Sequence, residues 1–232
     1  MLYVLKRKDQ IITLVDFLED GSVYKFHQDL VHPELAPLHD VKNHDWLKQW
    51  WKRRSVPISQ GHIRSMLAKK GLLGPEDFLL KNLGLSLTDY YWISPMDSGL
   101  TWKDVNLFDN AFHGDILISA DANEKKEEIP HYTPNGSLQG SLEKSWTILH
   151  GERGLLKGNR DQFSTESINE VIASTMHRMQ DFDAYTDYKL IKINGREYDY
   201  GCYSKLFTSQ KKELISAYEV VNDYSFEDLS RI

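Results

Sequence analysis

Three features in the second half of the chain have the residue types and spacing needed to hold the phosphates of a nucleotide. A loop rich in glycine and serine runs from Gly136 to Ser145, Lys157 ends an apolar strand, and Glu170 follows thirteen residues later in a helix. Glycines let backbone N–H groups approach phosphate oxygens, a strand lysine supplies a positive charge, and a helix carboxylate can hold that lysine in place. This order predicts a phosphate-binding site of the kind found in the N-terminal lobe of protein kinases.

The elements that must position these side chains can be read from hydrophobic spacing. Two apolar runs flank His150-Gly151 as a hairpin, and a helix is expected over about 165–179, where Glu170 adjoins an apolar stripe. Asn194-Gly195 between β-rich runs is a strong hairpin signal. The expected strands are 146–149, 154–157, 188–193 and 197–200, and residues 209–232 are weakly helical.

A structural interpretation of the same residues remains open. A lysine at a strand end followed by glycine, as in Lys157-Gly158, is commonly an ordinary hairpin residue, and a helical glutamate such as Glu170 is commonly solvated. The loop matches neither G-x-G-x-x-G nor the Walker pattern, because it offers only Gly136 and Gly140. Spacing alone therefore leaves both interpretations standing.

Segments 138–145, 155–157 and 166–170 together resemble the N-lobe of HipA-like serine/threonine kinases. Segments 83–93 and 102–108 look like the leader of a Firmicutes branch of that family, some of whose members are labelled excisionase. The resemblance implies ATP and Mg²⁺ as cofactors, with Lys157 on the α- and β-phosphates and Glu170 paired with Lys157. It also implies that four loop residues lie over the phosphates, namely Ser137, Gly140, Ser141 and Lys144.

The chain departs from that family in what should follow. The family's catalytic loop, of the H-x-x-N-x-D-R-H kind, is absent from the sequence, as is a later aspartate for Mg²⁺. Without a base or a metal ligand little phosphoryl transfer is expected. We therefore expect a fragment, a natural truncation or one half of a split kinase that is inactive alone. It would act by assembly with a kinase C-lobe or an antitoxin-like partner, in a toxin–antitoxin-like or regulatory setting.

A second candidate function rests on a basic segment in the first half. Residues 46–70 contain seven lysines and arginines and no acidic residue, in a chain whose net charge is −6. Two expected helices, at 44–54 and from Ser59 to Gly71, flank a short connection that roughly fits a helix-turn-helix. The alternative is a DNA-binding, excisionase-like or transcription-regulatory accessory protein. Its contacts would be Lys52, Arg53 and Arg54 on phosphates and Gln60, His62 and Arg64 at the recognition helix.

Two other interpretations of this segment are open. It can be a solvated basic helix whose Trp46 and Trp50 pack into the core, since charge runs usually form solvated faces. It can also dock an acidic protein partner. The histidines lack the paired spacing of a zinc site, and no metal site is predicted.

Length and composition limit the classes of protein to which the chain can belong. The 232 residues are 41% hydrophobic and 27% charged, as in ordinary globular proteins. The single cysteine, Cys202, excludes an internal disulfide, and a reducing cytoplasm is the expected location. No run approaches the 18 apolar residues of a membrane span, so no membrane partner is predicted.

The predicted fold class is α+β, with a boundary at the polar stretch 119–136. Residues 1–118 are expected to form a small α/β N-terminal cap domain that carries the basic helical pair. Residues 119–136 form a polar linker and the start of the glycine-rich loop. Residues 137–232 form a β-rich, kinase-N-lobe-like domain that lacks a C-lobe.

Overall fold

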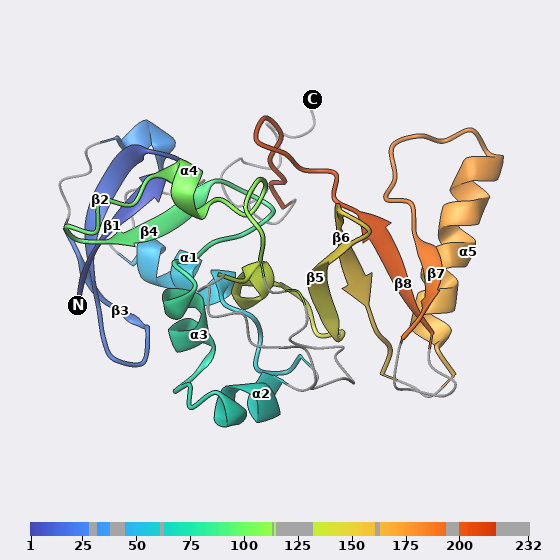
Figure 1. The fold of residues 1–232 in the computed structure, drawn as a ribbon, viewed down its shortest axis with the longest axis horizontal. Coiled ribbons are helices and arrows are strands. Elements are labelled where there is room, and N and C mark those ends of the chain that lie inside the picture. Colours follow the sequence, from blue (N-terminus) through green and yellow to red (C-terminus); the bar gives the residue numbers. More distant parts are fainter. Residues whose placement is uncertain are drawn as a thin grey trace.

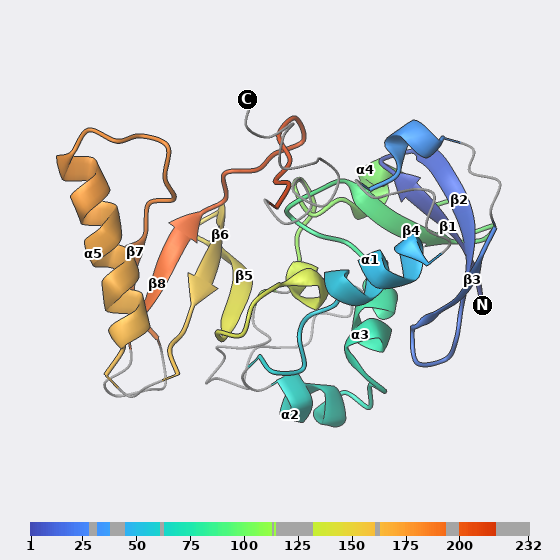
Figure 2. The ribbon, with the colours of Figure 1, turned by 180° about the vertical axis from the view of Figure 1, so that it is seen from behind.

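The computed structural model describes residues 1–27, 32–37, 45–60, 63–112, 114, 132–160, 163–193 and 200–216. Within them the fold is mixed α+β, as predicted, with two four-stranded antiparallel sheets (Figure 1). Figure 2 shows the same two sheets side by side from behind, with one helix at the outer end of the second sheet. No helix in the described part of the chain is long and apolar enough to span a membrane.

The first sheet is a meander closed by a later strand. Its strands are β1 (Leu2–Arg7), β2 (Gln10–Phe17), β3 (Val23–Phe26) and β4 (Tyr91–Pro95), in the order β3-β2-β1-β4. β1 and β2 form a hairpin, with Arg7 paired to Gln10 across a two-residue turn. Because every pairing is antiparallel, this unit is itself α+β and not an α/β unit with a parallel sheet.

The first unit also contains short helices, of which α1 contacts β3. They are η1 (Pro33–Leu35), α1 (Trp46–Arg54), α2 (Ile63–Lys69), α3 (Pro75–Lys81) and α4 (Trp102–Val105). In α1 the spacing of Trp46, Trp50 and Trp51 puts three indoles on one buried face, and the Trp51 indole donates to the Gly21 carbonyl at 2.8 Å. The tryptophans of the basic segment therefore form core, as one of the open interpretations held.

The second sheet forms around a hairpin and a crossing helix. It contains β5 (Lys144–Leu149), β6 (Glu152–Lys157), β7 (Lys189–Lys192) and β8 (Tyr200–Lys205), in the order β5-β6-β8-β7. Helix α5 (Thr165–Met179) connects β6 to β7 and packs against β8 and β7. The β5–β6 turn has positive φ at His150 and Gly151, 51° and 80°, which matches the type I′ geometry of two-residue hairpins. The predicted turn at Asn194-Gly195 lies outside the described residues.

The two sheets share one hydrophobic core. Leu138 and Trp146 belong to the same buried cluster as the core residues of the first sheet. The 3₁₀ turn η2 (Pro134–Ser137) is buried at Asn135 and Gly136, at the end of the segment predicted to be a linker. Residues 119–131 of that predicted linker lie outside the described residues.

After β8 the chain returns to the first unit as an irregular strap, residues 206–216. The Thr208 hydroxyl donates to the Leu87 carbonyl at 2.5 Å, and the Tyr90 hydroxyl donates to the Ser209 carbonyl at 2.7 Å. The predicted helix over 209–232 is wrong for 209–216, which contains an isolated bridge and no helix. The strap's polar groups bond to the first unit, and this competes with helix formation.

Candidate functional site

Two lysines face each other where β5 begins and β6 ends. Lys144 and Lys157 are directly paired across the antiparallel ladder, so their side chains project from the same face of the sheet. Burial lowers the pKa of Lys144, and the positive charge of Lys157 lowers it further, while Glu170 partly offsets both. The two ammonium groups therefore repel each other, and a bound anion would relieve this repulsion.

Lys157 is held by the helix that follows it. Its Nζ donates to Oε1 of Glu170 at 2.6 Å, and the two side chains are 16% and 35% exposed. The same ammonium lies 4.2 Å from the centroid of the Tyr188 ring. Burial lowers the pKa of Lys157, but hydrogen bonds and charge from Glu170 and Tyr188 outweigh burial, so the pKa is raised. Lys157 is consequently protonated throughout the physiological range.

A polar clamp fixes the start of α5 and so the position of Glu170. The Asn159 carboxamide oxygen accepts from the Ser167 backbone N–H at 2.8 Å, and its amide donates to the Tyr200 carbonyl at 2.5 Å. The Ser164 hydroxyl accepts from the Tyr200 N–H at 2.9 Å. Because Glu170 lies almost one turn after Ser167, the clamp at β8 aims the carboxylate at the end of β6.

Cys202 lies beneath this ion pair. It is directly paired with Lys157 across the β6–β8 ladder and is fully buried. Burial raises the pKa of its thiol. A buried thiol of raised pKa is a packing residue and not a reactive one.

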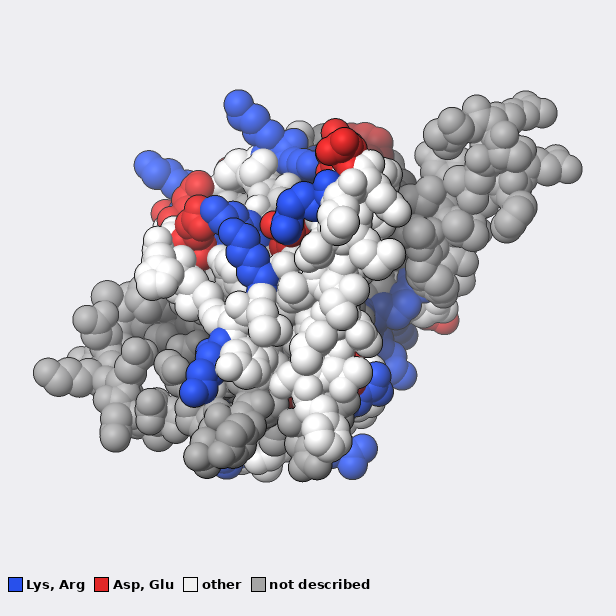
Figure 3. All heavy atoms as spheres, turned by 90° about the vertical axis from the view of Figure 1, so that its right-hand side faces the viewer, with Lys and Arg blue, Asp and Glu red and all other residues white. Residues whose placement is uncertain are grey.

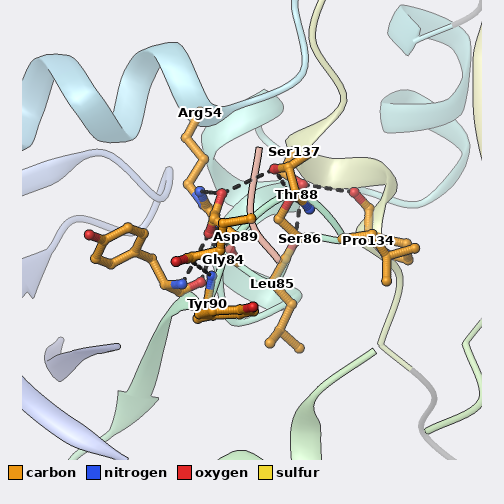
Figure 4. Close-up of polar contacts among 12 residues, drawn as sticks. Arg54, Gly84, Leu85, Ser86, Thr88, Asp89, Tyr90, Pro134 and Ser137 are labelled. Atoms are coloured by element: carbon orange, nitrogen blue, oxygen red, sulfur yellow. Dashed lines mark hydrogen bonds and ion pairs between the residues drawn. The ribbon is translucent and has the colours of Figure 1, made fainter. Parts of the chain in front are cut away.

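The loop before β5 contacts both the first unit and the second sheet. Gly140 has a φ of +92°, and a Cβ at that position would lie 2.7 Å from Lys144 Nζ. The Lys144 ammonium donates to the Gln139 carbonyl at 2.6 Å. Ser137 turns the other way, with its hydroxyl 3.1 Å from the Leu85 carbonyl and 2.9 Å from that of Pro134 (Figure 4). Ser141 is exposed at the loop surface.

The structure therefore brings together four of the six predicted phosphate-site residues. Gly140, Lys144, Lys157 and Glu170 form a connected set, which we call the lysine site. Ser137 is bonded to the first unit instead, because its hydroxyl donates to the carbonyl of Leu85.

The residues of the basic segment that were predicted to contact DNA are also partly internal and partly exposed. Arg54 is 9% exposed, and its guanidinium makes a bidentate pair with Asp89 at 2.7 Å (Figure 4). It also donates to the carbonyls of Gly84 and Tyr91, and it stacks over the Trp50 ring at 5.0 Å. All of these partners are internal, so Arg54 holds the segment before β4 and does not face outward as a phosphate contact must.

Gln60 is also internal. It is 2% exposed and its amide donates to the Gly140 carbonyl at 3.0 Å. The prediction that the second helix starts at Ser59 is wrong, because residues 57–60 form a turn closed by a bond from the Gln60 N–H to the Pro57 carbonyl. The described part of α2 spans Ile63–Lys69. Among the other predicted DNA contacts, Lys52, Arg53 and Arg64 are exposed, and His62 lies outside the described residues.

Several polar groups of this region were not found from the sequence. Tyr188, which completes the surroundings of Lys157, carries no local signal beyond its position at the start of a predicted strand. Asp89 pairs with an arginine 35 positions earlier, a separation that no periodicity reports. Two cavities of about 330 and 450 Å³ flank the Arg54–Asp89 pair, and neither is lined by Lys144 or Lys157. The lysine site is therefore separate from both cavities.

Comparison of the chain with models of protein families, with curated proteins and with solved structures found no match.

Proposed function

We propose that this chain provides the nucleotide-binding part of a HipA-like serine/threonine kinase. In this proposal Lys157 contacts the α- and β-phosphates of ATP, Lys144 neutralises further phosphate charge and Glu170 keeps Lys157 in place. The observation that carries it is the 2.6 Å contact between a lysine at the end of a strand and a glutamate in the next helix. That lysine–glutamate pair is a required part of the nucleotide grip in protein kinases.

The charge balance of the lysine site supports an anionic ligand. Two ammonium groups and one carboxylate leave an excess positive charge on a single face of the sheet. The raised pKa of Lys157 keeps it protonated, and the clamp on α5 keeps the carboxylate directed at it. Fixed positive charge aimed at phosphate oxygens stabilises them without reorganisation when the ligand arrives.

The conformation of the loop beside Lys144 also supports the proposal. Gly140 adopts a φ that L-residues rarely take, and its missing Cβ leaves room for the Lys144 ammonium. Gln139 and Gly140 are in turn tied to the first unit, through Arg54, Ser55 and Gln60. The first unit would thus act as the support that holds the loop over the phosphates.

The residues fit ATP better than they fit Mg²⁺. The described residues contain no group of three His, Cys, Asp or Glu arranged to hold a metal ion. Mg²⁺ is usually held by substrate phosphates together with one or two carboxylates. We therefore propose that the catalytic base and the metal-binding carboxylate belong to a kinase C-lobe or an antitoxin-like protein partner. Phosphoryl transfer would then require that assembly.

Thermal unfolding with and without millimolar Mg-ATP tests the proposal. A ligand at about ten times its Kd stabilises the folded state by about 1.4 kcal/mol. We expect this stabilisation in the wild type and its loss in Lys157→Met and Glu170→Gln. Lys205→Met is a matched control, because Lys205 pairs with Glu152 on the same sheet, also at 2.6 Å, but at an exposed position. Equal shifts in all four proteins, or none in the wild type, would contradict the proposal.

A further inference from the structure

The larger of the two cavities, of about 450 Å³, lies where the first unit, the second sheet and the strap meet. Its walls come from α1, the segment before β4, the loop before β5, β5 itself and the strap. The volume falls within the roughly 300–1,000 Å³ of pockets that hold small molecules, which often form where structural units meet. None of the four residues of the lysine site is among its described lining residues. We call it the junction cavity, and nucleotide binding leaves it without a role.

The apolar part of the junction cavity contains two indole rings. Trp50 of α1 and Trp146 of β5 line it, so the first unit and the second sheet each supply one ring. Both side chains belong to the shared core and are only 5% and 6% exposed, which fixes the positions of the rings. Leu138 and Leu214 complete the apolar lining. Walls of this composition favour a planar, aromatic ligand body.

The buried charges of the junction cavity already balance each other. Arg54 and Asp89 both line it, and they neutralise each other through two hydrogen bonds of 2.7 Å. Arg53 is the remaining charged residue of the described lining, and it is exposed. A charged ligand would lose its hydration without gaining an unpaired buried partner, which is costly. The interior therefore favours a neutral ligand.

The hydroxyl groups of the lining offer oxygen acceptors and not hydrogens. The Asp89 carboxylate can only accept, so the Thr88 hydroxyl donates to it at 3.1 Å, and the Ser86 hydroxyl then donates to Thr88 at 2.7 Å (Figure 4). The Ser137 hydroxyl donates to a backbone carbonyl at 2.9 Å. Each of these hydroxyl hydrogens is therefore used within the protein, whereas oxygen lone pairs remain for a ligand.

Gln139 adds a further acceptor, and the indoles add donors. The side-chain amide of Gln139 donates to the carbonyls of Arg54 and Ser55 at 3.0 and 3.2 Å, and its oxygen accepts from no described residue. The indole N–H groups of Trp50 and Trp146 likewise donate to no described residue. The lining thus combines several oxygen acceptors with two indole donors around an apolar space.

We propose that the junction cavity binds a neutral aromatic carboxamide. The aromatic ring lies against the indoles, and the N–H groups of the carboxamide donate to the oxygens of Ser86, Ser137 or Gln139. The carboxamide oxygen accepts from an indole N–H. A carboxamide matches this lining because it joins two hydrogen-bond donors and an acceptor in one uncharged plane. The proposal is independent of nucleotide binding at the lysine site.

Ligand-observed NMR titrations of the wild-type chain with three probes of one shape test the proposal. Benzamide carries the carboxamide, acetophenone replaces its NH₂ by CH₃, and benzoate replaces it by a charged oxygen. We expect saturable binding of millimolar benzamide and about tenfold weaker binding of the other two, because both lack the N–H donors that the lining oxygens require. Absence of saturable benzamide binding, equal binding of acetophenone, or tighter binding of benzoate would overturn the proposal.

Two neighbouring strap residues test where benzamide binds. Leu214 lines the junction cavity and is 45% exposed, so Leu214→Trp should occupy the cavity and abolish binding. Ile215 is 51% exposed and, of the two cavities, lines only the smaller, so Ile215→Trp should bind benzamide as the wild type does. Loss of binding in both variants, or in neither, would place the probe elsewhere and overturn the proposal.

A third variant tests the hydrogen bonds without filling the cavity. Gln139→Met keeps the length of the exposed side chain and removes its amide oxygen. We expect it to weaken benzamide binding about tenfold and to leave acetophenone binding unchanged. Equal weakening of both probes would show that Gln139 acts only on the shape of the cavity, and it would contradict the predicted donor–acceptor match. Circular dichroism checks that each variant keeps the fold.

Discussion

Lys157 and Glu170 join the end of a strand to the following helix through a 2.6 Å ion pair, although thirteen residues separate them in the sequence. Lys205 and Glu152 form a pair of the same length on the same sheet, but at a position where both side chains are more than half exposed. The two pairs differ in burial and surroundings and agree in chemistry. This makes the exposed pair an internal reference for what the buried environment adds.

We first expect Glu170→Gln to lower the free energy of unfolding by about 1–2 kcal/mol. The loss falls below that of a fully buried pair because Glu170 is 35% exposed. Urea unfolding of Glu170→Gln and of the reference variant Glu152→Gln measures the difference. We expect almost no change in the midpoint for Glu152→Gln, since exposed pairs contribute little. Equal losses would mean that Lys157 is no better held than Lys205.

Gly140→Ala should weaken nucleotide binding more than it weakens the fold. An alanine there adopts a strained positive φ, and its Cβ also occupies the space of Lys144 Nζ, 2.7 Å away. Gly151→Ala introduces the same kind of strain at φ +80°, with no atom within 4 Å of the added Cβ. Both variants should lose about 1 kcal/mol of stability. Only Gly140→Ala should also lose stabilisation by Mg-ATP in thermal unfolding.

Removing Lys157 should raise the pKa of Lys144. The positive charge of Lys157 is one cause of the lowered pKa of Lys144, and Glu170 acts in the opposite direction. Lys157→Met removes the repulsion and leaves Glu170 to attract Lys144. NMR titration of the lysine side-chain carbons measures the change, with Lys205→Met as the unaffected reference. An unchanged Lys144 would show that the two ammonium groups do not interact.

The two lysines should also affect stability in opposite senses at high pH. The folded pKa of Lys144 is lowered, so folding becomes more favourable as pH rises through that value toward the unfolded value of about 10.4. The folded pKa of Lys157 is raised, so its contribution is complete below about 10.4 and is lost as pH rises through the folded value. Comparing the single variants by urea unfolding at several alkaline pH values separates the two.

Arg54→Lys should destabilise the protein by about 2–4 kcal/mol although the charge is kept. A lysine cannot reproduce the bidentate pair with Asp89 together with the bonds to the Gly84 and Tyr91 carbonyls. Lys52→Met, at an exposed position two residues earlier in the same helix, should leave the urea midpoint nearly unchanged. If Arg54→Lys unfolded like the wild type, the internal role of Arg54 would be disproved.

Local patterns were enough to predict most of the elements and the central contact of the lysine site. The β5–β6 hairpin follows from two apolar runs around His150-Gly151, and α5 follows from its helical spacing. Glu170 was expected to meet Lys157 because of the resemblance to kinase N-lobes, and this contact is present.

The remaining features depend on contacts between distant parts of the chain. Nothing near Tyr200 indicates that β8 inserts between β6 and β7, since strand order is a global property. Ser137 was assigned to phosphates by the family resemblance, and Gln60 was assigned to DNA by its place in the expected recognition helix. Their hydrogen bonds go instead to the backbone carbonyls of Leu85 and Gly140. The spacing of its apolar residues predicted that α5 has an apolar stripe. It could not predict that the stripe faces outward, at the end of the molecule where Figure 3 shows a band of uncharged atoms, because periodicity does not say which face of a helix meets the sheet.

The strap after β8 has a mechanical consequence for the second sheet. The sheet is fastened to the first unit before β5, where the Val56 N–H bonds to the Gly136 carbonyl, and again after β8, at Thr208. Arg153 in β6 adds a third attachment, because its guanidinium donates to the carbonyls of Leu107 and Asn110. Helix α5 lies farthest from the first unit, whereas β5 lies beside it (Figure 1). Because the attachments hold the β5 and β6 side of the sheet, bending of the sheet would displace α5 more than Lys144.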